Sequence, residues 1–289
     1  MGPARGRRVT ANGLQHHLTE WDGGGDLTVL LLHGFLDLGP SWTFVVEALP
    51  ADLDWHVVAL DFRGHGQSDR VGPGGYYHFP DYVRDVAAIA RQIRRSRLVV
   101  VGHSMGAQVA SLWLGARPGD AQGLLLLEAL GPPPLAPADY PDRFARWLDE
   151  TVPFEPARFE RPMRDQAHAA DRLRRMHRGL DEADALRLAG WAAAPGDDGA
   201  WRWRYDPLHR TRSPLPLLPE AGQAFWARLD LPVWWIGGAD SPWVGPALHA
   251  RLAHIPNLVR QTLPNTGHML HTEAPRAVAD LCVQFVEAL

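Results

Sequence analysis

Short apolar runs alternate with amphipathic segments over roughly the first 130 residues of the chain. The segments Thr28–Leu32, Leu98–Val101 and Leu124–Leu127 are almost entirely aliphatic. Continuous apolar runs of this length are typical of strands buried on both faces of a parallel sheet, and the segments between them predict covering helices. The pattern therefore predicts an α/β fold with a mostly parallel central sheet and helices on both of its faces.

This alternation breaks at the glycine-proline run 131–134. Proline lacks the backbone N–H and restricts the residue before it, so neither a strand nor a helix continues through this run. An arginine-rich stretch with helical periodicity follows, and the core pattern resumes with a helix near Ala221 and the apolar run Leu231–Gly238. We expect residues 1–130 and 229–289 to form the core and residues 131–228 a helical cap inserted into it.

Ser104 occupies the centre of a G-x-S-x-G sequence, Gly102-His103-Ser104-Met105-Gly106, directly after an apolar run. A tight strand-to-helix turn brings backbones close together, and flanking glycines tolerate that approach because they lack Cβ. Such a turn exposes the serine hydroxyl at a helix N-terminus. Ser104 is the predicted nucleophile, and His103 is expected to serve packing.

A serine hydroxyl needs an imidazole to accept its proton and a carboxylate to orient that imidazole. Asp240 follows the predicted strand that ends in Gly237-Gly238, and His268 lies in the loop after the last predicted strand. We predict His268 as the base and Asp240 as the acid. Glu128, at the end of a buried run, is the alternative acid; otherwise it serves as a hydrogen-bonding group at the cap hinge.

Taken in chain order, these blocks resemble the α/β-hydrolase family of serine hydrolases with a helical cap. His33-Gly34-Phe35 is similar to the family's oxyanion loop, and residues 61–68 (DFRGHGQS) resemble its D-x-R-G-x-G-x-S turn. The resemblance covers nearly all of the chain. It implies an oxyanion hole formed by the backbone N–H groups of Phe35 and Met105, with His33 shaping the loop.

The resemblance implies two-step acyl transfer to water, and we expect hydrolysis of a small, largely hydrophobic carboxylic ester without a cofactor or a metal. The same triad in relatives also hydrolyses carbon–carbon bonds, lactones or thioesters, or transfers acyl groups, so these alternatives stay open. An aspartate in place of Ser104 would indicate dehalogenase or epoxide hydrolase chemistry. From a different class, the scaffold can also serve as a small-molecule binding protein with vestigial turnover.

Seven of the twelve tryptophans lie between residues 191 and 243. Bulky aromatic residues often only pack a small lid onto its core. They can also wall an apolar pocket, and on that interpretation Trp203 and Trp243 are the predicted substrate-pocket residues.

A metal site at His268, His271 and Glu273 is the weaker interpretation of the late histidines, because it competes with the triad for His268. The net charge of −4, and the lack of a basic stretch interleaved with aromatics, do not indicate nucleic-acid binding. No apolar run approaches the roughly 18 residues of a membrane span. The N-terminus lacks the apolar segment of a secretory signal, so a cytoplasmic protein is expected.

The chain has a single cysteine, Cys282, and no lysine among its 29 basic residues. One cysteine forms no intrachain disulfide, and its apolar surroundings predict a small buried side chain. Arginine and proline are abundant, which indicates a GC-rich bacterial source. A small molecule is the expected partner, and the oligomeric state is left open.

Overall fold

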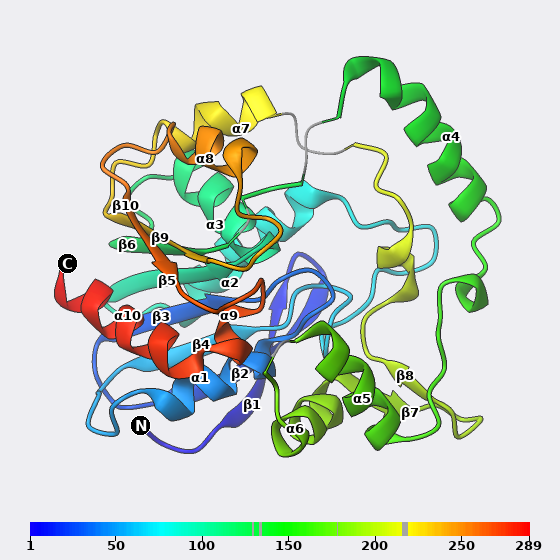
Figure 1. Ribbon diagram of the computed structural model, residues 1–289, viewed down its shortest axis with the longest axis horizontal. Helices are drawn as coiled ribbons and strands as arrows, with labels where there is room; N and C mark the ends of the chain where they lie inside the picture. The colour runs from blue at the N-terminus through cyan, green and yellow to red at the C-terminus, as the bar shows by residue number, and fades with distance from the viewer. Residues whose placement is uncertain (129, 133–134, 178, 216–218) are drawn as a thin grey trace.

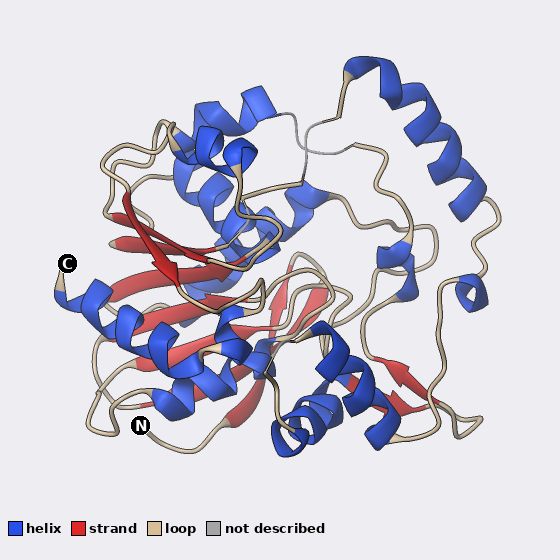
Figure 2. Ribbon diagram, viewed as in Figure 1, coloured by secondary structure: helices blue, strands red, loops and turns tan. Residues whose placement is uncertain are grey.

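The computed structural model describes residues 1–128, 130–132, 135–177, 179–215 and 219–289. Pro133 and Pro134 of the predicted break lie outside the described residues. A single large sheet runs through the centre of the molecule (Figures 1 and 2). Its strands are β1 (Arg5–Ala11), β2 (Leu14–Asp22), β3 (Leu27–Leu32), β4 (His56–Leu60), β5 (Arg97–His103), β6 (Gly123–Leu127), β9 (Val233–Gly238) and β10 (Val259–Leu263).

The strand order across the sheet is β1-β2-β4-β3-β5-β6-β9-β10. The pairs β1–β2 and β2–β4 are antiparallel, and every neighbouring pair from β4 to β10 is parallel. The aliphatic runs supply the central parallel strands because these are covered on both faces. This confirms the predicted mostly parallel sheet. The parallel strands also end at one edge, where Ser104, Glu128 and the loop after β9 meet.

Alternate side chains of the central strands feed two separate cores. In β3, Leu30 packs into one core and Val29 into the other, as the two-residue side-chain period of a strand requires. One face is covered by α2 (Phe79–Ile93), α3 (Met105–Ala116), α7 (Pro219–Trp226) and α8 (Pro246–Leu252), and the other by η1 (Gly39–Trp42), α1 (Thr43–Ala48), α9 (Leu270–Glu273) and α10 (Pro275–Glu287).

Most of the segment between β6 and β9 lies outside this layered core. It contains α4 (Tyr140–Thr151), α5 (Gln166–Met176), α6 (Glu182–Ala192), the short hairpin of β7 (Ala193–Pro195) and β8 (Trp201–Trp203), and the 3₁₀ turns η2 (Pro137–Asp139), η3 (Pro156–Arg158) and η4 (Pro207–Arg210). Helices α5 and α6 begin where Asp165 and Asp181 cap them: each side chain accepts a hydrogen bond from the backbone N–H three residues on.

The last helix of this segment, α7, packs onto the core instead. Trp226 is fully buried in the same core as α3, and its Nε1–H donates to Ser111 Oγ at 3.1 Å. Gly115 of α3 allows the backbone of Phe225 to approach closely, because a Cβ there would collide with it. Residues 219–226 therefore contribute to core packing, although they fall inside the predicted cap range 131–228.

Among the described residues, no helix is both long enough and apolar enough to cross a membrane.

Candidate active site

The turn between β5 and α3 presents Ser104 in a strained backbone conformation. Ser104 has φ 50° and ψ −109°, and a positive φ is rare for a residue with a Cβ. A Cβ on Gly102 would lie 2.6 Å from Ala107 N, and one on Gly106 would collide with the backbone of Leu32. The two glycines thus allow the tight strand-to-helix turn, which leaves Ser104 partly exposed at the start of α3.

Glu128 is the carboxylate that contacts His268. His268 Nδ1 lies 2.8 Å from Glu128 Oε2, and Glu128 is fully buried. Its Oε1 accepts from Gly238 N at 2.6 Å and its Oε2 from Ser241 Oγ at 2.5 Å. Because the Glu128 carboxylate accepts a hydrogen bond from Nδ1–H, Nδ1 carries the proton and Nε2 is left as the basic nitrogen.

The prediction of Asp240 ahead of Glu128 as the orienting acid is wrong in this geometry. Asp240 lies beyond the end of β9 and is exposed, and its backbone N–H donates to Thr266 O at 3.0 Å. The hydrogen bonds that hold a carboxylate at His268 come from Gly238 and Ser241, and both go to Glu128. Glu128 has a positive φ of 70° directly after β6.

His33 organises the predicted oxyanion loop. Its Nε2 accepts from Phe62 N at 3.0 Å, so its Nδ1 is the protonated nitrogen and donates to Gly34 O at 2.6 Å. Burial lowers the pKa of His33, in keeping with a neutral ring. A Cβ on Gly34 would lie 3.5 Å from Ser104 Cβ. The loop therefore passes directly beside the Ser104 turn.

The backbone amides of Phe35 and Met105, predicted as oxyanion donors, flank the serine from this loop and from the first residue of α3. Within the described part of the chain, neither amide is paired with a protein acceptor. Unpaired backbone N–H groups beside a serine are suited to a developing oxyanion. Among the same residues, no hydrogen bond joins the Ser104 hydroxyl to His268; such bonds are often long in unliganded enzymes.

Ser104 and His268 line one cavity of about 660 Å³. Of the two predicted pocket tryptophans, Trp243 lines this cavity, with its ring centroid 6.0 Å from that of His268. The prediction for Trp203 is wrong, since it lines a separate small hollow with Arg202 and Tyr205. Besides Phe35 of the oxyanion loop, four aromatic residues outside the predicted site line the main cavity, Tyr76, Tyr77, Phe79 and Tyr82.

The sequence pattern did not point to these four aromatic residues. The run Tyr76-Tyr77-His78-Phe79 follows the D-x-R-G-x-G-x-S turn and a glycine-rich stretch. The glycine-rich stretch is the one sequence signal for them, because it indicates a loop that can return toward the ends of the strands. Tyr77 is fixed there because its hydroxyl donates to Asp206 at 2.8 Å, which links this loop to the late part of the insertion.

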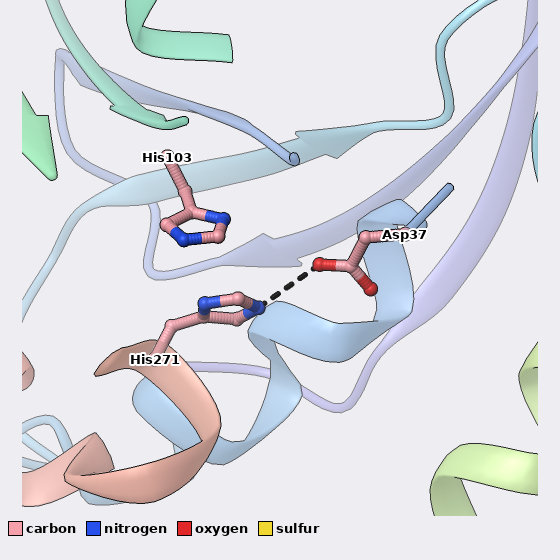
Figure 3. Close-up of side chains that lie close together, drawn as sticks. All are labelled: Asp37, His103 and His271. Carbon is pink, nitrogen blue, oxygen red and sulfur yellow. Dashed lines mark hydrogen bonds and ion pairs between the residues drawn. The ribbon is translucent and has the colours of Figure 1, made fainter. Parts of the chain in front are cut away.

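Three buried side chains behind His268 form the group with the best donor set for a metal among the described residues. Asp37, His103 and His271 each offer a ligand atom within 4.8 Å of the others (Figure 3). His271 Nε2 lies 3.0 Å from Asp37 Oδ2, and His103 Nε2 lies 2.8 Å from His268 O. The rings of His103 and His271 are tilted by 50° to each other, with centroids 4.7 Å apart.

His271 is bonded to Asp37 and His103 to the His268 backbone, so this arrangement favours a hydrogen-bonded support for the His268 loop. Burial by itself raises the pKa of Asp37, but the hydrogen bond from His271 and the charges of nearby histidines hold it below its ordinary value. Among the described residues, the alternative set of His268, His271 and Glu273 does not form such a group; His268 contacts Glu128 and His271 contacts Asp37 instead.

Comparison with known proteins defines the class to which this site belongs. Residues 29–281 match the model of the alpha/beta hydrolase family, and the chain is therefore a member of that family. A serine hydrolase-like protein from Danio rerio is 31% identical over 173 residues, which are 59% of this chain and 52% of that protein. The chain thus spans about half the length of that relative.

Two further relatives show how varied the family's chemistry is. Epoxide hydrolase A from Mycobacterium tuberculosis is 32% identical over 209 residues, covering 69% of this chain and 62% of that protein. The solved thioesterase domain from the curacin biosynthetic pathway is 26% identical with a TM-score of 0.88, and the match covers 98% of this chain and all of that domain. These likenesses confirm the fold and leave the substrate open.

Proposed function

We propose that the protein is a serine hydrolase that cleaves a carboxylic ester through Ser104, His268 and Glu128. The observation that carries the proposal is the 2.8 Å contact between His268 Nδ1 and the buried Glu128 carboxylate, beside a strained serine that lines the same cavity. A positioned base and a group that orients it are what a serine hydroxyl needs to become a nucleophile.

In the proposed reaction, Ser104 Oγ attacks the substrate carbonyl while His268 Nε2 takes the hydroxyl proton. The amides of Phe35 and Met105 donate to the tetrahedral oxyanion, and each such donor typically contributes about 10²–10³ in rate. His268 then protonates the departing alcohol, which leaves an acyl-enzyme. A water molecule, deprotonated by His268, releases the acid and regenerates Ser104.

Glu128 acts through His268 as a positioning residue. It keeps the imidazole in the tautomer with a basic Nε2 and stabilises the imidazolium that forms. Because Glu128 also accepts from Gly238 and Ser241, its carboxylate is fixed before the substrate arrives. This arrangement needs no movement of the acid during the reaction.

Covalent labelling tests the proposal directly. A fluorophosphonate should add to the protein in a one-to-one ratio, and peptide mass spectrometry should locate it on Ser104. Ser104→Ala should lose both the label and p-nitrophenyl ester hydrolysis while keeping its unfolding midpoint. Absence of labelling in a folded protein would favour the alternative of a binding protein with vestigial turnover.

Thioester hydrolysis is the second candidate, favoured by the likeness to the curacin thioesterase domain over 98% of the chain. The same attack and the same oxyanion stabilisation apply, with a thiol as the leaving group. Matched p-nitrophenyl and N-acetylcysteamine esters of one acyl chain separate the two. A higher kcat/KM for the thioester would assign the protein to that class.

A further inference from the structure

The cavity that contains Ser104 has an uneven balance of charge. Among the described residues, its lining includes three arginines, Arg143, Arg210 and Arg212, and no aspartate or glutamate. Most of the other lining residues are aromatic, aliphatic or small. A cavity with apolar walls and only cationic charged groups complements an amphipathic molecule that carries a negative charge.

Arg143 is the least solvated of the three arginines. It projects from α4 and is half-buried, and its Nε–H donates to Ser213 O at 2.5 Å. Burial, and then the positive charge of Arg212, lower its pKa. The neighbours that act in the opposite direction are Tyr140 and Tyr76, and neither of them is a carboxylate.

Some arginines elsewhere in the molecule are paired with carboxylates. Arg63 is buried and pairs with Asp85 at 2.6 Å, and Arg187 of the cap pairs with Glu47 at the same distance. Among the described residues, no carboxylate lies within ion-pair distance of Arg143, and its two terminal amino groups have no protein acceptor. None of the seven residues outside the described set is acidic. Arg143 therefore offers two donor groups to a ligand.

Gln108 is a second unsatisfied group in the same cavity. It lies one helical turn after Ser104 on α3, where its N–H donates to Ser104 O at 3.1 Å. Its side chain is 1% exposed and lines the cavity, and within the described part of the structure it has no hydrogen-bond partner at Oε1 or Nε2. A buried amide without partners is costly by about 1–3 kcal/mol, and a ligand group in the cavity would remove that cost.

We propose that the substrate is an acyl compound that carries an anionic oxygen group, with Arg143 as its cationic partner and Gln108 as a second polar contact. This inference rests on the proposed hydrolase function and specifies its substrate class. The anion is either a carboxylate at the far end of the acyl chain or a phosphate on the leaving thiol. Both present oxygen atoms that a guanidinium binds through paired N–H donors.

Matched substrates distinguish the two sources of charge. Mono-p-nitrophenyl glutarate and p-nitrophenyl pentanoate share a five-carbon acyl chain and differ in a terminal carboxylate. The pentanoyl thioesters of 4′-phosphopantetheine and of pantetheine differ only in the phosphate on the thiol. We expect kcat/KM for the anionic member of one pair to be at least about 10-fold higher than for its neutral counterpart, because a hydrogen bond between charged groups stabilises binding by about that factor.

Arg143→Gln should remove that preference: the ratio of kcat/KM for the anionic substrate to that for its neutral counterpart should fall by about 10-fold or more. Arg146→Gln is the matched control, because Arg146 is exposed on the same helix and does not line the cavity. Gln108→Glu should also reduce turnover of the anionic substrate selectively, since like charges repel. Unfolding midpoints of each variant verify that the fold is kept.

The outcomes separate this inference from the proposed function. If Ser104 is labelled and neutral esters are hydrolysed, but neither pair shows an anionic preference, the inference is wrong and the hydrolase assignment stands. The same holds if Arg143→Gln lowers both members of a pair equally. If Ser104 is not labelled, the hydrolase proposal fails first. Stabilisation of the wild-type protein by glutarate over pentanoate, lost in Arg143→Gln, would then still support an anion site.

Discussion

The cavity lies between two regions of different construction. On the core side, Glu128 accepts three hydrogen bonds, and His33 is bonded at both ring nitrogens. On the cap side, α4 buries none of its residues and is held by contacts such as that of Arg143 with Ser213 O. Groups that perform chemistry must keep one geometry, whereas groups that select a substrate need only the right shape and charge.

The insertion itself contains a second contrast. Helices α5 and α6 share a hydrophobic cluster with Leu38 and Phe44 of the core region. Helix α4 leaves Leu148 48% exposed and lies well apart from α5 and α6 (Figure 1). We infer that α5 and α6 contribute to the stability of the whole fold, while α4 contributes mainly to the cavity.

The core side should show the largest effect. Glu128→Gln should lower kcat by about 10³–10⁴, because the amide cannot hold His268 in the required tautomer. Asp240→Asn, at an exposed position, should change kcat by no more than about twofold. Steady-state kinetics with a p-nitrophenyl ester measure both. Glu128→Asp should restore part of the rate and of the wild-type pH profile, which a purely structural role would not require.

The opposite ranking, with Asp240→Asn the more damaging change, would return the orienting role to Asp240. Unfolding curves of all three variants must accompany the kinetics, because Glu128 also bonds to Gly238 and Ser241. A loss of rate that follows a loss of folded protein would contradict the positioning role.

The contrast between α6 and α4 should appear in the free energy of unfolding when one leucine of each helix is shortened to alanine. Leu188 of α6 is 1% exposed, so Leu188→Ala should reduce the free energy of unfolding by about 2–5 kcal/mol. Leu148→Ala on α4 should cost about 0.5 kcal/mol or less, as is usual for surface positions. Urea unfolding followed by circular dichroism measures both. Equal losses would show that α4 is as firmly docked as α5 and α6.

The sequence predicted the central sheet and its covering helices because apolar runs are local signals. It also predicted the serine turn, because the glycines that permit such a turn are a local signal too. The choice between Glu128 and Asp240 as the orienting acid could not be made from local sequence signals. Both residues follow strands that end at the same edge, and only the three-dimensional positions of Gly238 and Ser241 decide which carboxylate faces His268. A sequence pattern does not encode that contact.

The pocket residues show the same limit. Trp203 and Trp243 both belong to the tryptophan-rich stretch 191–243, yet Trp203 lies in the β7–β8 hairpin beside a different hollow. Arg143 lies on a helix without buried residues, where an arginine is ordinarily a solvated surface group. Its approach to the cavity follows from the course of the loop that carries Ser213, which the sequence pattern did not reveal.

A buried histidine joins the cap to the core and should make this junction sensitive to acid. His177, just after α5, lies with Nδ1 2.9 Å from Thr272 Oγ1 of α9. Burial, opposed only in part by the charge of Asp37, lowers its pKa from 6.5 to about 4. Between these two pH values the unfolded chain binds the proton more tightly, so stability falls as the pH drops from 6.5 toward 4.

Each tenfold difference in proton affinity between the folded and unfolded chain corresponds to about 1.4 kcal/mol, so His177 accounts for up to about 3 kcal/mol of this loss. His177→Gln keeps a hydrogen-bonding side chain without the titration, so its unfolding free energy should decline less steeply between pH 6.5 and 4. His254→Gln, at an exposed position, should follow the wild-type curve. Identical slopes for wild type and His177→Gln would contradict this prediction.

The smallest predicted effect is a change in acyl-chain preference, and it compares two tryptophans, one from each region. Trp243 follows β9 on the core side and lines the cavity, whereas Trp203 of the cap lines the separate hollow.

Each methylene buried against an apolar wall is worth about 0.8 kcal/mol, or roughly fourfold in kcat/KM. In the wild type, kcat/KM should therefore rise along a series of p-nitrophenyl esters until the cavity is full. Trp243→Ala should flatten that rise and leave the acetate ester little changed, and Trp203→Ala should leave the whole profile as it is. A flattened profile in Trp203→Ala alone would show that the hairpin, and not the loop after β9, sets the acyl length.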